Sequence, residues 1–144
     1  PLAATATLLI NDYVLKAAWP GVVTEKLSDF AGLFIFPIIL VCLAELAKCL
    51  ARKMPWAITN FGIVVACGLT ALAFTLVKTC DWASGLYADA IGSIRWVFRA
   101  LACLFFGGTA GPAVPIDVVT DPTDVVAVLA VVGSGLWMLR KVQR

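Results

Sequence analysis

Histidine is absent from the 144-residue sequence, and charged residues make up only 14% of it. Without an imidazole, the chain cannot form a Ser-His-Asp or Cys-His catalytic arrangement, a histidine metal site or a histidine-ligated haem. The formal net charge is +2, and lysine and arginine form no continuous basic stripe. Nucleic acid is therefore not an expected partner.

Cysteine occurs five times, but no two cysteines form a CxxC pair. Cysteine zinc sites need such close spacing or a histidine partner, so none is predicted. Cys42, Cys49 and Cys67 lie in apolar runs, where a thiol behaves as a small hydrophobic side chain. Cys80 and Cys103 are the one pair that could meet. The sequence indicates no cofactor, no metal and no assigned catalytic residue.

Hydrophobic residues make up 62% of the chain, whereas a soluble domain has ~45–50%. This composition predicts an all-α integral membrane helix bundle, with residues 1–144 forming one transmembrane domain. Segments 30–50, 56–78 and 124–139 are each long enough, at ~1.5 Å per residue, to cross or nearly cross a hydrocarbon core of ~30 Å. Residues 1–19 have a shorter apolar part and are read as the outer part of a first spanning helix. About four transmembrane helices are therefore predicted.

The stretch 80–120 differs from these segments, because its apolar run 96–106 is interrupted by Arg99 and is too short to span. Basic residues follow the second and fourth predicted helices, so the positive-inside rule places both of these ends in the cytoplasm. These basic residues are Lys48, Arg52 and Lys53, and then Arg140, Lys141 and Arg144. The second and fourth helices would therefore cross the membrane in the same direction, which requires an odd number of crossings between them. The third predicted helix supplies one crossing. The stretch 80–120 should therefore begin and end outside as a re-entrant or interfacial helix, with Arg95 and Arg99 on one face.

Polar side chains gather at the face that this topology places outside. The segments VTEKLSDFAGL and VVTDPTDVVAV both place a hydroxyl residue and an aspartate before an apolar run, which makes a weak internal repeat. Helix capping by Ser28, Asp121 and Thr123 would explain these residues. Ionisable groups near hydrocarbon are costly, however, and usually pair or face a polar cavity. The candidate functional set is Asn11, Asp12, Lys16, Lys26, Ser28, Asp29, Lys78, Asp121 and Asp124.

Opposite charges in this set are spaced for pairing. Asp12 and Lys16 are an i,i+4 pair, and Lys26 and Asp29 are an i,i+3 pair. We predict that the outer ends of the second and fourth helices lie side by side, so that Asp124 and Asp29 each approach a lysine or arginine. A carboxylate gains most from an opposite charge within ~4–6 Å.

Two further patterns concern the interior of the predicted helices. Glu45 precedes Lys48 by three residues near the cytoplasmic end of the second helix, which favours a paired interfacial glutamate. The pairs Gly62 with Ala66 and Ala130 with Ser134 have the small-xxx-small spacing that lets helix backbones approach closely. These faces are predicted to pack inside the bundle or against a partner.

Five motifs, in order NDYVLK, WPG, VTEKLSDFAGL, FTLVKT and DPTDVVAV, resemble those of an uncharacterised group of small bacterial polytopic membrane proteins. The pattern of that group is close to NDH-LK, PG, TGKLSDFAGL and DPTDLLAL. The resemblance extends from about Leu8 to Val128. It implies a location in the bacterial inner (cytoplasmic) membrane and the importance of the polar set, without assigning roles. Tyr13 replaces the histidine of the pattern and Glu25 its glycine, so any chemistry of that histidine would be lost here.

Three functions are compatible with these observations. The favoured one is a non-catalytic integral membrane subunit or scaffold that packs in the lipid bilayer against other membrane-protein subunits, since the chain is small and lacks catalytic side chains. A small ion-coupled or solute carrier using the outer Asp/Lys cluster is the alternative, based on the internal repeat. The third is an intramembrane carboxylate enzyme using Asp29 and Asp124. A cation site among Asp117, Asp121 and Asp124 matches no known loop motif.

Overall fold

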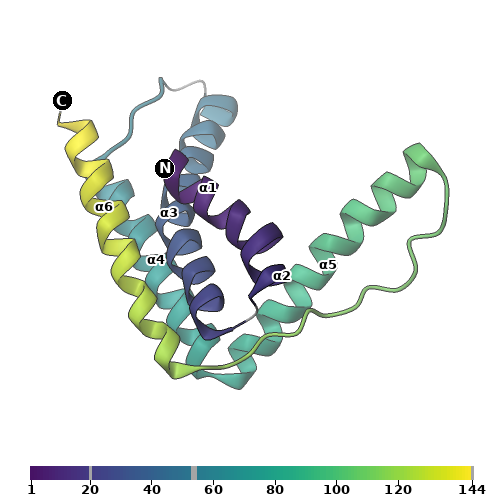
Figure 1. Cartoon of the computed structure of the whole chain (residues 1–144). Coiled ribbons are helices and arrows are strands. Elements are labelled where there is room, and N and C mark those ends of the chain that lie inside the picture. The colour runs from purple at the N-terminus through teal and green to yellow at the C-terminus, as the bar shows by residue number, and fades with distance from the viewer. Residues whose placement is uncertain (20, 53–54, 144) are drawn as a thin grey trace. The chain divides into compact units, whose positions relative to one another are not determined.

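The computed structural model describes residues 1–19, 21–52 and 55–143, and within these ranges it contains helices and loops but no strand. The predicted all-α fold is confirmed (Figure 1). Lys53 and Arg144, two of the basic residues behind the predicted orientation, lie outside the described residues. The elements are α1 (Leu2–Ile10), η1 (Asn11–Leu15), α2 (Lys16–Ala18), α3 (Val22–Arg52), α4 (Asn60–Thr79), α5 (Asp81–Phe106), η2 (Pro122–Val128) and α6 (Leu129–Val142).

Among the residues that the structure describes, three helical stretches are long and apolar enough to cross a membrane. They are Lys26–Ala51 within α3, Asn60–Thr79, which is α4, and Pro122–Val142, which joins η2 to α6. They coincide with the three segments predicted from hydropathy, so the structure is compatible with an integral membrane protein. The stretch Leu2–Leu15 is a shorter apolar helix and does not reach spanning length in the described chain.

The start of α3 differs from the prediction. The helix begins at Val22 rather than at Phe30, so Ser28 lies inside the helix and is not its cap. Thr24, in the first turn, bonds back to the residue before the helix: its Oγ1 accepts the Gly21 N–H at 3.2 Å and donates to the Gly21 carbonyl at 2.8 Å. The polar residues before Phe30 have helical propensity enough to extend the apolar helix, which a hydropathy boundary does not reveal. Pro122 occupies the first helical position of η2, where its missing N–H costs no hydrogen bond.

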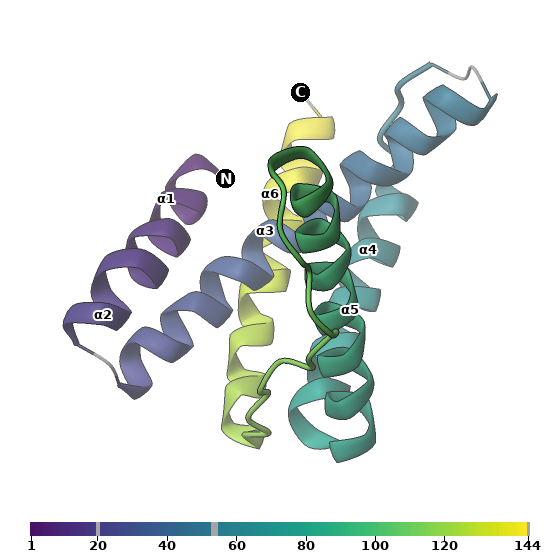
Figure 2. The ribbon, with the colours of Figure 1, turned by 90° about the vertical axis from the view of Figure 1, so that its right-hand side faces the viewer.

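The chain forms two units, one of residues 1–74 with 123–144 and the other of residues 75–122. In the first unit, α1 lies along the first half of α3 (Figure 2). The helices α3, α4 and α6 pack together through two apolar clusters, one around Ile63 and Met138 and the other around Leu33 and Val131. A single transmembrane domain stays a prediction.

Small side chains line the contact between α4 and α6 in this unit, as the spacing of Gly62 with Ala66 and of Ala130 with Ser134 predicts. Ala66 and Ser134 are buried. A Cβ atom on Gly135 would lie only 3.1 Å from the Cys67 sulfur. Such contacts allow the close helix approach on which packing in lipid depends. The predicted use of these faces inside the bundle is therefore confirmed.

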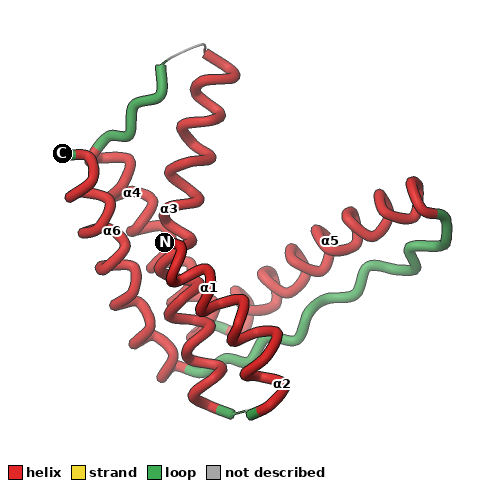
Figure 3. The backbone as a smooth tube through the Cα atoms, turned by 45° about the horizontal axis from the view of Figure 1, so that its top comes forward, coloured by secondary structure: helices red, strands yellow, loops and turns green. Residues whose placement is uncertain are grey.

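In the second unit, α5 spans 26 residues and the following segment, residues 107–121, runs back along it (Figure 3). The helix begins at Asp81, so the short helix predicted over 96–106 is only its last part. Cys80 and Cys103 stand at opposite ends of this helix, ~34 Å apart at 1.5 Å per residue. They cannot meet, and all five cysteines are free.

Candidate functional site

A π-helical segment, Asn11–Leu15, follows α1 directly. Segments of this kind are uncommon and frequently occur at functional sites. Asn11 is fully buried, with 0% of its surface exposed. Its Nδ2 donates to the Thr24 carbonyl oxygen at 2.6 Å and to Ser28 Oγ at 2.8 Å, both on α3. A polar side chain thus joins the first helix to the third.

The hydrogen bonds continue from Asn11 to a carboxylate. The Ser28 hydroxyl accepts from Asn11 and donates to Asp12 Oδ1 at 2.5 Å. Thr24 contributes its backbone carbonyl to the same place. We call Asn11, Asp12, Thr24 and Ser28 the Asn11 group. The group thus joins a carboxylate, an amide, a hydroxyl and a backbone carbonyl through three hydrogen bonds.

The second polar contact joins α3 to η2. Lys26 Nζ lies 2.6 Å from Asp124 Oδ1 and 2.9 Å from Thr123 Oγ1. The side chains of Lys26 and Asp124 are 33% and 12% exposed. We call Lys26, Thr123 and Asp124 the Lys26 group. The prediction that the two helix starts lie side by side, with a lysine next to Asp124, is confirmed.

The two groups lie on opposite faces of α3. Thr24 and Ser28 are one helical turn apart and share a face, whereas Lys26 is rotated by ~200° from Thr24 at ~100° per residue. The Asn11 group therefore faces α1, and the Lys26 group faces η2. The sequence suggested one polar set, but the structure divides it between two faces of α3.

The remaining predicted residues lie elsewhere. Asp29 is half-buried in α3, one residue past Ser28. The backbone of Lys16 begins α2, but its side chain lies outside the described residues. Lys78, in the last turn of α4, and Asp121, before η2, belong to the second unit. The structure thus brings five of the nine predicted residues into the two groups: Asn11, Asp12 and Ser28, and Lys26 and Asp124.

Two threonines in these groups were absent from the predicted set. Thr24 contributes through its backbone carbonyl, which no side-chain pattern can indicate, and its side chain accepts the Gly21 N–H at the start of α3. Thr123 appeared in the sequence only as a candidate cap, but it shares the Lys26 ammonium with Asp124. The Val-Thr dipeptide in both halves of the weak repeat was the available signal for Thr24.

One buried acceptor in the Asn11 group has no partner in the part of the chain that the structure describes. It is Asn11 Oδ1. The Thr24 carbonyl can only accept, so the amide must turn its NH₂ toward Thr24 and its oxygen away. A buried acceptor without a donor costs ~1–3 kcal/mol, and a water molecule or a cation would relieve that cost. This atom is the most unusual feature of the site.

The chemistry available to the two groups is limited. Asp124 pairs with the Lys26 ammonium, which also donates to Thr123 Oγ1, and this pairing favours a structural role over acid-base catalysis. Across residues 1–19, 21–52 and 55–143, no three His, Cys, Asp or Glu side chains gather as a metal site. The groups are therefore suited to holding helices together and to binding a small polar species at Asn11.

A third polar contact lies near the other end of α3. Glu45 is 5% exposed and forms an ion pair with Lys48, as predicted. Its second oxygen accepts the Ala57 backbone N–H at 3.2 Å. A carboxylate here would be costly without both partners. Glu45 thus fixes the segment that leads into α4 against α3.

Comparison of the chain with protein-family models, with curated proteins and with solved structures gave no match. Its function is therefore inferred from its own residues.

Proposed function

We propose that this chain is a non-catalytic integral membrane subunit or scaffold that packs against other membrane proteins. The observation that carries the proposal is how little of each spanning stretch is covered by the chain itself. Only 28% of the most apolar window of Lys26–Ala51, 17% of that of Asn60–Thr79 and 22% of that of Pro122–Val142 are buried. Lipid covers apolar side chains as well as a protein does, so exposed apolar area alone does not indicate a partner. The size of the exposed side chains does, because small residues let another helix approach closely.

The open surface of α3 has the character of a helix-packing face. Ala44, Ala47 and Ala51 are exposed and follow one another at helical spacing. Small residues let a second backbone approach closely, and such faces drive association of helices in lipid. The buried small residues of the α4–α6 contact show the same use within this chain. A partner helix would lie along Ala44–Ala51.

The proposal includes a topology of four crossings in the cytoplasmic membrane of a bacterium, with residues 1–19 as the outer part of the first. Arg140 and Lys141 in the last turn of α6 support a cytoplasmic C-terminal end. The return of residues 107–121 along α5 supports a second unit that begins and ends at one membrane face. A re-entrant α5 would dip into the hydrocarbon core and return, whereas an interfacial α5 would lie at the membrane surface.

Labelling with an impermeant thiol reagent tests this topology in a cysteine-free background. Cysteine at exposed Val23, before the spanning stretch Lys26–Ala51, should react from outside intact cells. Cysteine at exposed Gln143 should react only after the membrane is opened. The reverse pattern would overturn the orientation.

Purification of the native assembly tests the subunit proposal. The chain should co-migrate with a defined set of membrane proteins after extraction in a mild detergent. Ala47→Trp should release it from that assembly, whereas Ala73→Trp, at an exposed position of α4, should not. A chain that migrates alone, or release by both variants equally, would contradict the proposal.

A small carrier is the second candidate, and the unpartnered Asn11 Oδ1 in a π-helical segment favours it. Discontinuous or irregular helices supply backbone and side-chain ligands in many carriers. Uptake by vesicles containing the purified chain should then be lost in Asn11→Ala and kept in Asn60→Ala, which alters an exposed asparagine. Equal uptake by both variants would remove this candidate.

A further inference from the structure

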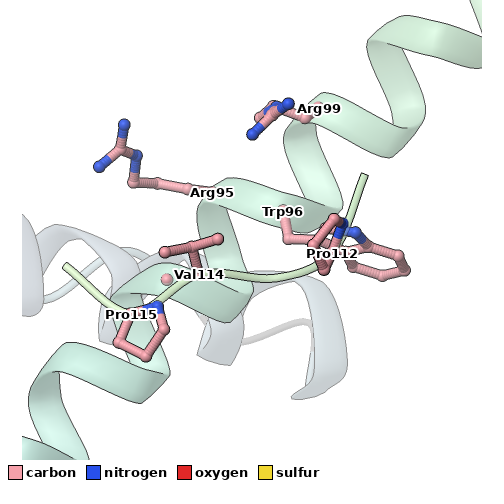
Figure 4. Close-up of a pocket in the computed structure, with 7 residues that line it drawn as sticks. Arg95, Trp96, Arg99, Pro112, Val114 and Pro115 are labelled. Carbon is pink, nitrogen blue, oxygen red and sulfur yellow. The ribbon is translucent and has the colours of Figure 1, made fainter. Parts of the chain in front are cut away.

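Within the second unit, α5 and the returning segment 107–121 enclose a cavity of about 160 Å³ (Figure 4). Arg95, Trp96 and Arg99 line it from the helix, and Val114 and Pro115 line it from the returning segment. Neither polar group of the first unit contributes to it. None of the side chains that line this cavity is acidic.

The wall formed by the returning segment is held at three places. The Trp96 indole N–H donates to the Gly111 carbonyl at 2.6 Å, and the Ile116 N–H donates to the Ala88 carbonyl at 3.3 Å. Between these bonds the segment passes so close to Gly92 that a Cβ atom there would lie 2.5 Å from the Val114 carbonyl oxygen. The cavity therefore has a defined wall on each side.

The two arginines make the cavity positive. Arg95 and Arg99 are one helical turn apart, and their side chains extend to the same side of α5 (Figure 4). Neither forms an ion pair with any carboxylate of the described chain. Two neighbouring guanidinium groups repel each other, so an anion between them would lower the energy of both.

The opposite face of α5 is broadly apolar. At ~100° per residue, its side chains cluster on the side of the helix away from Arg95 and Arg99. They are exposed, and they include Ile94, Val97, Leu101 and Leu104. A helix with one apolar and one basic face lies at the membrane surface, where its charges are level with lipid phosphates.

We propose that this cavity binds a phosphate group through the guanidinium groups of Arg95 and Arg99. Guanidinium presents paired N–H donors that match two phosphate oxygens, and such charge-assisted bonds are the strong ones. The phosphate is that of an anionic lipid headgroup or of a dissolved phosphate, since both present the same oxygens.

Binding measurements on the full chain in a neutral, phosphate-free detergent test this. The probes are short-chain phosphatidylglycerol, short-chain phosphatidylcholine and inorganic phosphate, with retention counted by native mass spectrometry. The double variant Arg95→Gln/Arg99→Gln should lose about tenfold or more of the affinity for phosphatidylglycerol. The control Arg140→Gln/Lys141→Gln removes two positive charges from the end of α6 and should change the affinity less than about twofold.

The outcome for each probe identifies the source of the phosphate. Arginine-dependent binding of phosphatidylglycerol alone assigns a lipid headgroup, and arginine-dependent binding of inorganic phosphate as well assigns the phosphate itself. Unchanged binding in the arginine variant, an equal loss in the control, or no saturable binding of any probe would overturn the proposal.

A second pair of variants tests the cavity without changing its charge. Gly92→Ala must displace the returning segment, because its Cβ would meet the Val114 carbonyl. Gly85→Ala is a matched control on the same helix, since nothing lies within 4 Å of its Cβ. Loss of binding in Gly92→Ala alone supports the enclosed cavity. Full binding in both would show that the arginines act as a surface charge and would refute the site.

Discussion

The attachment of α1 to α3 should depend on Asn11. No residue of α1 is buried, and Asn11 is the one buried residue of η1. Apolar contacts between α1 and α3 contribute little in a bilayer, because lipid tails solvate these side chains equally well. The specific contacts between the two segments in the described chain are thus the two hydrogen bonds from Asn11 Nδ2 and the bond from Ser28 to Asp12.

Asn11→Ala removes both bonds and is the sharpest perturbation of this contact. An interhelical hydrogen bond in a membrane is worth ~0.6–2 kcal/mol, so the two together amount to ~1–4 kcal/mol. The Thr24 carbonyl keeps its place in α3, but the Ser28 hydroxyl loses one partner. At 1.4 kcal/mol per factor of ten, α1 should open ~5–700 times more often.

Hydrogen exchange of the chain in lipid nanodiscs measures this opening directly. Amides of residues 5–15 should exchange faster in Asn11→Ala by that factor, while those of α4 keep their rates. Asn60→Ala, at an exposed asparagine, is the matched control and should leave α1 unchanged. Ser28→Ala removes both the bond that Ser28 accepts from Asn11 and the bond that it donates to Asp12, so it should also raise the exchange rates of α1. Unchanged exchange of α1 in Asn11→Ala would refute the reasoning.

The other predictions concern packing and charge in the first unit. Lys26→Met should destabilise the fold by ~1–4 kcal/mol, because the side chain of Asp124 is 12% exposed and would lose its partner. The double variant Lys26→Met/Asp124→Asn should lose less stability than Lys26→Met alone. Additive losses of stability in a double-mutant cycle would contradict the pairing. Gly135→Ala should be less stable to thermal unfolding than Gly133→Ala by ~1–3 kcal/mol. A Cβ at Gly135 would lie 3.1 Å from the Cys67 sulfur, whereas a Cβ at Gly133 would have ordinary contacts at 3.8 Å. Equal stabilities of the two variants would show that α4 and α6 can move apart without cost. Glu45→Leu should raise protease cleavage between α3 and α4, because the Ala57 N–H loses its acceptor; unchanged cleavage would assign that connection to other contacts.

Local features of the chain could be predicted because they depend on neighbouring residues. The spanning stretches follow from runs of apolar residues, which need no knowledge of packing. The pair of Glu45 with Lys48 follows from i,i+3 spacing along one helix. The placing of Lys26 beside Asp124 required one further step, the direction of the helices, which the basic residues at their ends supplied.

The sequence by itself determined an all-helical chain with three apolar stretches of membrane-spanning length, because hydropathy and helix period are properties of the chain alone. Only the tertiary structure decided that Asn11 is buried, since its burial comes from α3 and not from its own apolar neighbours. The structure also shows that the polar residues of α3 lie on two faces of that helix. The helix starts at Val22, so residues that are close in sequence point in different directions around its axis. The position of the returning segment along α5 was likewise decided only by the tertiary structure. Its contacts at Gly92 and Trp96 are with residues that are distant in the sequence, and helical periodicity does not predict such contacts.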